Sequence, residues 1–338
     1  MAEDRLDQSR LESYLAHNVP QIGRLNGLEK FSDGQSNPTY LVDASAGQFV
    51  LRRQPPGELL KSAHAVDREF RVIKALQQSA VPVAQAIHLC QDRDVIGSLF
   101  YLMSYEAGRI FWDPALPELA PDERAAIYSE MNRVLAALHD VDVEAVGLVD
   151  FGRPGSYFER QVSRWSGQYR ATEIEPIPAM DRLIEWLPQN LPDDDGKVSL
   201  IHGDFRIDNI IFDPQHPRAK AVLDWELSTL GHPYADLAYQ CMQWRMARDC
   251  VIPGFGDTDR VALGIPSEQD YVTQYCERRG LDGIPDWNFY LVFGFFRFAA
   301  ILQGVLKRAL DGNASSQKAF DYGALAPLLA QQAQELID

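Results

Sequence analysis

Cysteine is scarce in this sequence, and its few copies follow no pattern. The chain of 338 residues has four cysteines: Cys90, Cys241, Cys250 and Cys276. No two of them form a C-x-x-C pair, and none stands at metal-ligand spacing from another. This argues against both a disulfide scaffold and a cysteine metal site. We therefore expect reduced thiols and a cytoplasmic protein.

Positive charge is also in short supply. The formal net charge at pH 7 is -16, from 32 Lys and Arg against 48 Asp and Glu. Proteins that bind nucleic-acid phosphates carry a local or overall excess of Lys and Arg. We therefore expect neither a nucleic acid nor an anionic membrane as a partner.

No hydrophobic run is long and clean enough for a membrane span. The best candidate, Phe289–Leu306, is interrupted by Arg297 and then by Gln303. A spanning helix needs an uninterrupted run of about 18 residues, so we expect a buried helix instead. Residues 1–7 lack the basic region and the apolar core of a signal peptide.

Size and composition are those of a globular enzyme with more than one core. Hydrophobic residues make up 46% of the chain and charged residues 24%, which is ordinary for a globular protein. A single core stops growing at about 250 to 300 residues. A chain of this length is therefore expected to form two lobes.

The densest chemistry lies between residues 200 and 226. Asp204 and Asn209 stand in one segment, which follows the apolar pair Leu200-Ile201. Asp224 ends a second apolar segment, 221–223, which follows the turn-rich residues 213–217. Two short strands paired as a hairpin would bring these ends together.

This set of side chains suits phosphoryl transfer, in which the protein mainly positions the reactants and neutralises charge. One carboxylate must orient and deprotonate the acceptor hydroxyl, and Asp204 fits that role. Asn209 and Asp224 offer the hard oxygen ligands that a magnesium ion bridging ATP phosphates prefers. The spacing from Asp204 to Asn209 matches the kinase catalytic loop, with His202-Gly203-Asp204 in place of His-Arg-Asp.

On these motifs the chain resembles the aminoglycoside phosphotransferase/choline kinase superfamily. Within it, the sequence is similar to the kinase-like domains related to those fused to acyl-CoA dehydrogenases, from about Leu28 onward. The resemblance implies an α/β (α+β) protein-kinase-like fold with two lobes. Residues 1–104 would form a small lobe with an N-terminal helix, an antiparallel sheet and one further helix. Residues 105–338 would form a larger helical lobe with the catalytic loop and the acceptor site. ATP and Mg²⁺ are the implied cofactors.

The loop that would cover the nucleotide phosphates has a single glycine, Gly34, so the cover would rely on Ser36 and Asn37. Backbone N–H groups of such a turn can bind phosphate, although the segment alone is more typical of an ordinary hairpin. On the next expected strand, Arg52 stands where kinases have Lys. Its fork can bind phosphate in a bidentate way; the alternative is a solvated arginine at a strand end. Glu69, on a helix expected over residues 62–78, is the predicted ion-pair partner of Arg52.

The resemblance also implies roles for residues around the hinge and the catalytic loop. Backbone groups of Ser104, Tyr105 and Glu106 would bind the adenine edge. Arg206 would stabilise charge on the transferred phosphate, and we group it with His202 and Asp204 as catalytic. Asp236, at a helix start, would support the loop by accepting backbone N–H bonds near His202.

Two features stay open. Region 151–170 gathers aromatic and basic residues, which form either part of an acceptor-binding wall or an insertion packed on the lower lobe. Arg297, within an apolar helix, needs a partner because an unpaired buried charge is costly. It either reaches the acceptor pocket or extends to the surface.

The sequence therefore predicts an ATP- and Mg-dependent phosphotransferase with an alcohol group as acceptor. The kinship with dehydrogenase-linked domains suggests a hydroxyacyl-CoA or hydroxy acid as the acceptor, and an acyl-CoA dehydrogenase in the same pathway. An aminoglycoside or amino-alcohol kinase is the alternative, which an acidic pocket around Asp204 would favour. A non-catalytic nucleotide-binding pseudokinase or partner module is an alternative of another class. The absent strand Lys favours it, and the intact Asp204, Asn209 and Asp224 oppose it.

Overall fold

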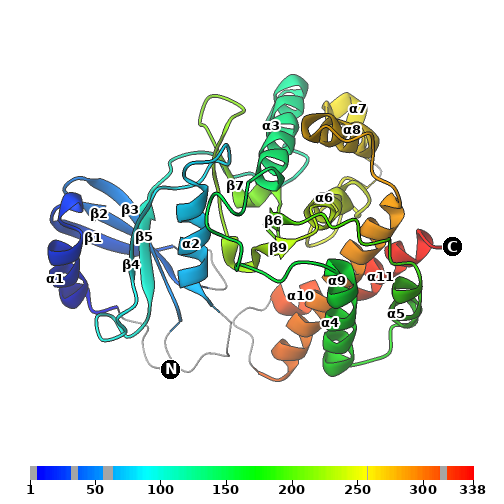
Figure 1. The fold of residues 1–338 in the computed structure, drawn as a ribbon, viewed down its shortest axis with the longest axis horizontal. Coiled ribbons are helices and arrows are strands. Elements are labelled where there is room, and N and C mark those ends of the chain that lie inside the picture. The colour runs from blue at the N-terminus through cyan, green and yellow to red at the C-terminus, as the bar shows by residue number, and fades with distance from the viewer. Residues whose placement is uncertain (1–5, 32–36, 56–63, 257, 313–317) are drawn as a thin grey trace. The chain divides into compact units, whose positions relative to one another are not determined.

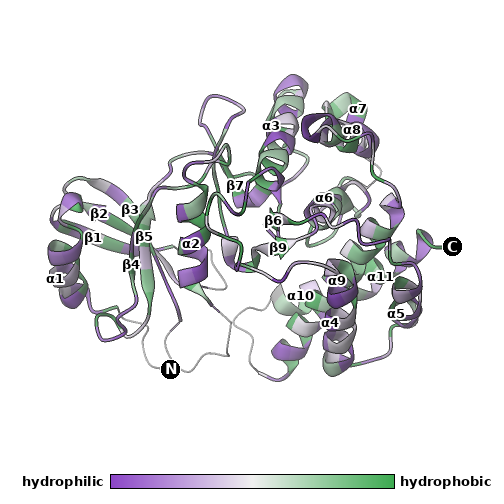
Figure 2. Ribbon diagram, in the orientation of Figure 1, coloured by the Kyte–Doolittle hydropathy of each residue, from purple (hydrophilic) through white to green (hydrophobic). Residues whose placement is uncertain are grey.

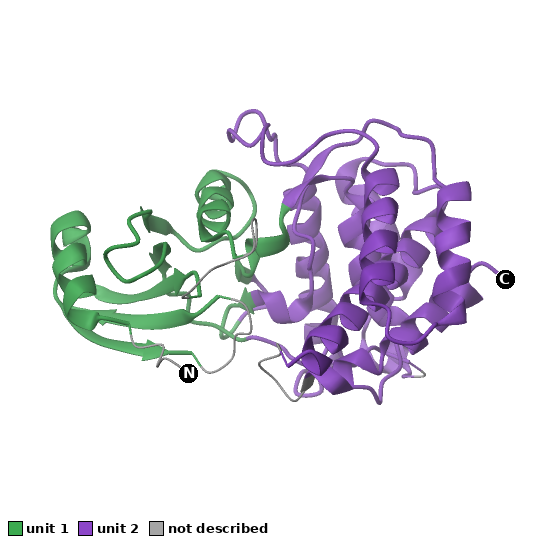
Figure 3. Ribbon diagram, turned by 90° about the horizontal axis from the view of Figure 1, so that it is seen from below, with its two compact units in different colours: residues 1–109, 211–215, 219–228 green, residues 110–210, 216–218, 229–338 purple. Residues whose placement is uncertain are grey.

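The chain folds into two compact units. The computed structural model describes residues 6–31, 37–55, 64–256, 258–312 and 318–338 (Figure 1). The first unit comprises residues 1–109, 211–215 and 219–228, and the second comprises residues 110–210, 216–218 and 229–338 (Figure 3). The expected division after residue 104 thus lies five residues before the observed one, and it omits two later segments of the first unit.

An antiparallel five-stranded sheet forms the frame of the first unit, in the order β1-β2-β3-β5-β4. Two longer helices and a short 3₁₀ turn, η1, accompany it. The elements are α1 (Gln8–Asn18), η1 (Pro20–Ile22), β1 (Leu25–Lys30), β2 (Thr39–Ala44), β3 (Gly47–Arg53), α2 (Val66–Leu76), β4 (Ala86–Cys90) and β5 (Phe100–Ser104).

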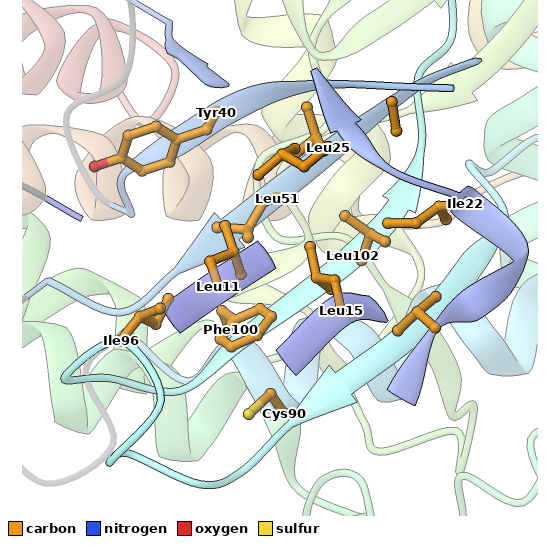
Figure 4. Packing of buried hydrophobic residues seen from close by; sticks show 13 residues of the cluster. Leu11, Leu15, Ile22, Leu25, Tyr40, Leu51, Cys90, Ile96, Phe100 and Leu102 are labelled. Atoms are coloured by element: carbon orange, nitrogen blue, oxygen red, sulfur yellow. The ribbon is translucent and has the colours of Figure 1, made fainter. Parts of the chain in front are cut away.

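The two faces of this sheet have different partners, because side chains alternate along a strand. Leu51 and Leu102 belong to a buried cluster with Leu11 and Leu15 of α1 (Figure 4). Their neighbours Arg52 and Tyr101 pair across β3 and β5 and contact Glu69 of α2 on the other face. Helix α1 thus packs on the hydrophobic face of the sheet, and helix α2 packs on the opposite face, where the contacts are polar and buried.

A later segment of the chain completes the first unit. The predicted hairpin is present as β7 (Ile210–Phe212) paired with β8 (Ala219–Val222), followed by the 3₁₀ turn η3 (Trp225–Leu227). Arg109 and Phe212 exchange two backbone hydrogen bonds of 2.8 and 2.9 Å. The N–H of Val222 donates to the carbonyl of Pro82 at 2.9 Å. These bonds hold Asp224 in the same unit as Arg52.

The second unit is mainly helical and contains one small antiparallel sheet of β6 and β9. Short 3₁₀ turns also occur. The elements are α3 (Pro121–His139), α4 (Tyr157–Thr172), α5 (Pro178–Gln189), β6 (Ser199–Ile201), η2 (Ile207–Asn209), β9 (Thr229–Gly231), α6 (Tyr234–Cys241), η4 (Met242–Trp244), α7 (Arg260–Leu263), α8 (Glu268–Arg279), α9 (Trp287–Leu310), α10 (Lys318–Gly323) and α11 (Ala326–Glu335).

Helix α9 is the centre of this unit and packs against α4, α6, α10 and α11. Among the described residues it is the one helix long and apolar enough to cross a membrane, yet 83% of its most apolar window is buried within the protein. This agrees with the buried helix expected there. In contrast, α8 at the surface is drawn mainly in the hydrophilic colour (Figure 2).

Close approach of two backbones at Gly152 yields a stability prediction. A Cβ atom at Gly152 would lie 2.5 Å from both the amide nitrogen of Leu230 and the Thr229 hydroxyl on β9. At Gly167, inside α4, a Cβ atom would meet nothing within 4 Å. We expect Gly152→Ala to lower the free energy of unfolding by about 1–3 kcal/mol through overpacking. The matched Gly167→Ala should raise it by about 0.5–1 kcal/mol, because alanine favours the helix.

Urea unfolding of the two variants and the wild type checks this pair. A Gly152→Ala variant as stable as the wild type would show that β9 can move away from residue 152 at little cost.

Candidate active site

One buried carboxylate anchors the loop that follows β6. Asp236, in the first turn of α6, is fully buried and accepts hydrogen bonds from the backbone N–H groups of His202 (2.6 Å) and Gly203 (2.8 Å). Gly203 has a φ of +86°, a conformation that glycine adopts without strain. The contact expected from the position of Asp236 at a helix start is therefore present.

The same carboxylate stays ionised despite its burial. Burial raises the pKa of Asp236, but His139 and the N–H group of His202 outweigh this and lower the pKa below its usual value. The His139 Nε2 atom lies 3.5 Å from the carboxylate, and its Nδ1 atom is 2.7 Å from the Tyr275 hydroxyl. An ionised acceptor binds N–H donors more strongly than a neutral one, so the loop is firmly held.

Asp204 is held at both of its carboxylate oxygens. The Tyr239 hydroxyl donates to Oδ1 at 2.7 Å, and Nδ2 of Asn209 donates to Oδ2 at 3.1 Å and to the backbone carbonyl of Asp204 at 2.9 Å. The side chain is still 23% exposed. Burial raises the pKa of Asp204, but the Arg206 guanidinium and the Tyr239 hydroxyl outweigh it, so the pKa lies below its usual value. The result is an ionised carboxylate with a fixed direction and access to solvent.

His202 does not have the catalytic role that the sequence suggested. Its side chain is fully buried, and its Nδ1 atom accepts a 3.2 Å hydrogen bond from the backbone N–H of Asp204. A group with no exposed surface cannot contact a substrate. His202 is therefore a positioning residue that fixes the backbone of Asp204, which is a correction to the catalytic assignment.

Arg206 lies between two carboxylates of the same loop. Its guanidinium contacts Asp208 at 2.6 Å and Asp204 Oδ1 at 3.6 Å, and its side chain is 25% exposed. Burial alone would lower the pKa of Arg206, but the nearby carboxylates raise it above its usual value. Asp208 is the ion-pair partner that orients Arg206 beside Asp204.

Arg297 resolves one of the open questions. It is 7% exposed, and it donates a 2.8 Å hydrogen bond to the backbone carbonyl of Gly203. Its guanidinium also lies over the rings of Tyr239 (5.5 Å) and Trp165 (5.7 Å). These contacts compensate its buried charge. Arg297 therefore neither extends to the surface nor stands unpaired. From helix α9, it stabilises the catalytic loop through the carbonyl of Gly203.

The first unit contains a second group of charged side chains. Arg52 forms ion pairs with Glu69 at 2.8 Å and with Asp224 at 2.7 Å, and Glu226 lies 3.8 Å away. The ion pair between Arg52 and Glu69 is the one predicted from sequence. Asp224 has a left-handed backbone, with φ of +60°, which Asp tolerates better than most residues.

The charged side chains around Arg52 shift the pKa values of one another. Burial raises the pKa of Glu69 to about 7, against the lowering effect of Arg52 and with a further raising effect of Asp224 and Glu226. The same carboxylates raise the pKa of Arg52 above its usual value, although burial opposes them. Arg52 therefore stays charged in its buried position.

Asn37 supports this group and has no exposed side chain to offer a ligand. It is 2% exposed, its Nδ2 donates to Glu69 at 2.7 Å, and its Oδ1 lies 3.0 Å from His64 Nδ1. The Asn37 side chain therefore serves Glu69, and the expected cover of the phosphates by the loop's backbone N–H groups stays a prediction. The other two expected residues of that loop, Gly34 and Ser36, lie outside the described residues.

One of the three residues expected to bind adenine through its backbone has its N–H group already occupied. The N–H group of Ser104 donates to the carbonyl of Gln85 at 2.9 Å, so it is not available for an adenine ring. The Ser104 hydroxyl donates to Glu106 at 2.7 Å, and Glu106 lies 3.4 Å from Lys220. The backbone groups of Tyr105 and Glu106 remain the predicted contacts.

Each unit thus assembles part of the predicted set. The first unit brings together Arg52, Glu69 and Asp224, and the second brings together Asp204, Arg206, Asn209 and Asp236. Sequence reasoning missed Tyr239. Its position three residues after Asp236 on the same helix would have placed both side chains on one face, and this spacing is the signal that could have found it.

Comparison with known proteins identifies the family of this chain. Residues 27–271 match the phosphotransferase enzyme family, APH. A solved structure from Ralstonia eutropha, described as a candidate aminoglycoside phosphotransferase, is 46% identical, with a TM-score of 0.89 and 98% of both chains covered. Mouse acyl-CoA dehydrogenase family member 10 is 49% identical over 331 residues, which are 97% of this chain but 31% of that protein. The chain therefore spans about a third of this curated relative.

More distant solved structures establish the fold. An aminoglycoside phosphotransferase in ternary complex with ADP and hygromycin B is 16% identical, with a TM-score of 0.62. With its antiparallel sheet unit and its helical unit, the chain has the protein-kinase-like fold expected from sequence. The family match covers well over half of the chain, and the resemblance inferred from the motifs is confirmed. The chain belongs to the phosphotransferase enzyme family, APH, which makes it a relative of kinases that act on small molecules.

Proposed function

We propose that this protein transfers the γ-phosphate of ATP, with Mg²⁺, to a hydroxyl group of a hydroxyacyl-CoA or hydroxy acid. One observation carries the proposal. Asp204 is ionised, partly exposed and held at both carboxylate oxygens by Tyr239 and Asn209, within a loop anchored on Asp236. In a chain of this family, such a carboxylate is suited to orient an acceptor hydroxyl.

In the proposed reaction, Asp204 accepts a hydrogen bond from the acceptor hydroxyl and aligns its oxygen with the γ-phosphorus. The new bond joins that oxygen to phosphorus, and the bond from phosphorus to the β-γ bridging oxygen breaks. The hydroxyl proton passes to the Asp204 carboxylate, and ADP leaves. Because transfer of this kind depends mainly on alignment and on charge stabilisation, the restraints on Asp204 and the adjacent guanidinium of Arg206 supply the main catalytic contributions.

The residues present fit a nucleotide with its metal. In the proposal, Arg52 binds phosphate oxygens, and Glu69 keeps its guanidinium directed. Asn209 uses its Nδ2 on Asp204, which leaves its carbonyl oxygen as a hard ligand, and Asp224 has a second carboxylate oxygen beyond the one paired with Arg52. Bound Mg²⁺ would neutralise charge on the phosphates.

The acceptor class rests on the relatives. The curated relatives are named as acyl-CoA dehydrogenases, for example human family member 11, which is 41% identical over 99% of this chain and 44% of its own length. A kinase unit beside a dehydrogenase unit would act on a related thioester, so a hydroxylated acyl group is the favoured acceptor and a separate acyl-CoA dehydrogenase a fitting pathway partner. The description of the 46% identical structure favours an aminoglycoside instead, and the test below separates the two.

The first test is Mg-dependent ATP consumption by the wild type and by Asp204→Asn. The panel contains hydroxyacyl-CoAs, free hydroxy acids, aminoglycosides and amino alcohols. We expect turnover with a hydroxyacyl-CoA or hydroxy acid, reduced about 10²–10⁴-fold in Asp204→Asn because the proton acceptor is lost. Asp122→Asn, at the exposed start of α3, is the control and should keep full activity. Turnover with aminoglycosides alone would refute the acceptor class, and ATP binding without turnover on any compound would favour a non-catalytic module.

Arg206 provides a second test, of charge stabilisation. Arg206→Ala should lose turnover but keep ATP affinity, because the guanidinium is expected to act on the transferred phosphate and not on the bound nucleotide. Isothermal titration with ATP and steady-state rates measure the two quantities separately. Unchanged turnover in this variant would remove Arg206 from the mechanism.

Tyr239 provides a third test, of positioning. Tyr239→Phe removes the 2.7 Å hydrogen bond to Asp204 Oδ1. We expect kcat to fall roughly tenfold to a hundredfold, since a hydrogen bond to a charged group contributes about 1.5–3 kcal/mol. The KM for ATP should not change. Tyr271→Phe is the matched control, because that hydroxyl donates to Gln240 in the core. It should lower stability and leave kcat unchanged; equal losses of kcat in both variants would contradict a specific role of Tyr239.

A further inference from the structure

A basic groove runs along the N-terminal part of α4, within the second unit. It has a volume of about 590 Å³, and its basic residues are Arg153, Arg160 and Arg164. A second depression of about 310 Å³ adjoins it and shares the residues around Arg153 and Glu159. Volumes of this size are typical of small-molecule sites.

The three arginines of this groove have no carboxylate partner among the described residues. Arg160 donates to the backbone carbonyls of Arg153 (2.5 Å) and Pro154 (3.4 Å), and the Arg164 guanidinium lies 5.3 Å from the Trp165 ring. By contrast, Arg170 on the same helix pairs with Glu173 at 3.2 Å and with Asp181 at 2.6 Å. The lining of the groove has these three guanidinium groups and one carboxylate, Glu159, so its net charge is positive although the chain has a net charge of -16. Such a groove selects an anion, and phosphate is the anion that the arginine fork matches best.

The groove is connected to the catalytic loop through side-chain contacts within the same unit. Arg164 lies over Trp165, Trp165 lies 5.7 Å from Arg297, and Arg297 lies 5.5 Å from the ring of Tyr239. The Tyr239 hydroxyl in turn binds Asp204. Helix α4, which supplies Arg164 and Trp165, and helix α9, which supplies Arg297, lie side by side (Figure 1). A ligand with its phosphates in the groove would therefore need a long arm to place a hydroxyl at Asp204.

The smaller depression has a different lining from the groove. Its walls include the aromatic side chains of Tyr157, Phe158 and Tyr290 and the carboxylates of Asp193 and Asp194. Aromatic walls suit a planar base, and carboxylates accept hydrogen bonds from an exocyclic amino group. The depression adjoins the groove, as adenine adjoins the phosphates in an acyl-CoA. A pantetheine arm, comparable with about four extended residues, reaches about 14 Å from those phosphates.

We propose that this groove binds the phosphates of the CoA moiety of the acceptor, with Arg153, Arg160 and Arg164 as their ligands. The inference rests on the proposed function, because it names the part of the acceptor that lies away from the reacting hydroxyl. It adds a specificity site: the groove distinguishes a CoA thioester from the free hydroxy acid.

The test is direct binding of CoA, measured by isothermal titration in the presence of excess ADP. The ADP fills the ATP site, so that the adenosine diphosphate part of CoA cannot bind there. We expect the wild type to bind CoA, and 4′-phosphopantetheine, which lacks the adenosine phosphates, to bind at least about tenfold more weakly. Substitution of each groove arginine by alanine should weaken CoA binding about tenfold, because each loses a charge-assisted hydrogen bond. Arg170→Ala, on the same helix but paired with carboxylates, should bind CoA like the wild type.

The outcomes separate this inference from the proposed function. CoA affinity that is unchanged in the combined Arg153→Ala, Arg160→Ala and Arg164→Ala variant, or absent from the wild type, overturns the inference, even if hydroxy acids are phosphorylated. Lost CoA affinity in that variant, with turnover of a free hydroxy acid intact, supports the inference and shows that the variant is folded. CoA binding that follows these expectations, without any phosphorylation of hydroxyacyl groups, would contradict the proposed function alone.

Discussion

The arrangement of the catalytic loop depends on one buried carboxylate. Asp236 accepts two successive backbone N–H groups from the loop and lies beside His139 in the core. Burying an ionised carboxyl is costly, and these donors compensate the cost only when the loop is in its observed place. The need of this charge for hydrogen-bond donors therefore fixes the backbone of His202 and Gly203. Because Asp204 follows directly, the direction of its side chain is fixed as well.

In the first unit, the guanidinium of Arg52 is held in the same way, by buried partners of opposite charge. Arg52 is held by Glu69 and Asp224, and Glu69 is itself held by Asn37 and Tyr101. In both units a functional side chain is oriented by partners that are themselves buried and hydrogen-bonded. Orientation before ligand binding lowers the entropic cost of reaction. In the proposed function, this orientation of Arg52 serves the binding of nucleotide phosphates.

Much of the fold and of the candidate site could be predicted because the signals are local. The hairpin of β7 and β8, the buried helix α9 and the ion pair between Arg52 and Glu69 follow from turn residues, hydropathy and spacing. The error concerns a side chain whose role depends on burial. His202 was grouped with the catalytic residues, but it is enclosed by the core and acts on the backbone of a neighbouring residue instead.

The sequence by itself determined the family, the two-unit architecture and the set of charged residues, because spacing along a strand, loop or helix specifies which side chains share a face. Only the tertiary structure decided the partners of groups distant in sequence. Arg297 meets Gly203 from a helix more than ninety positions away, and Tyr239 meets Asp204 across α6 and the loop. The role of Arg153, Arg160 and Arg164 was ambiguous until the structure showed that no carboxylate among the described residues pairs with them. Burial, and the charges that remain uncompensated after folding, are properties of packed neighbours that no local pattern contains.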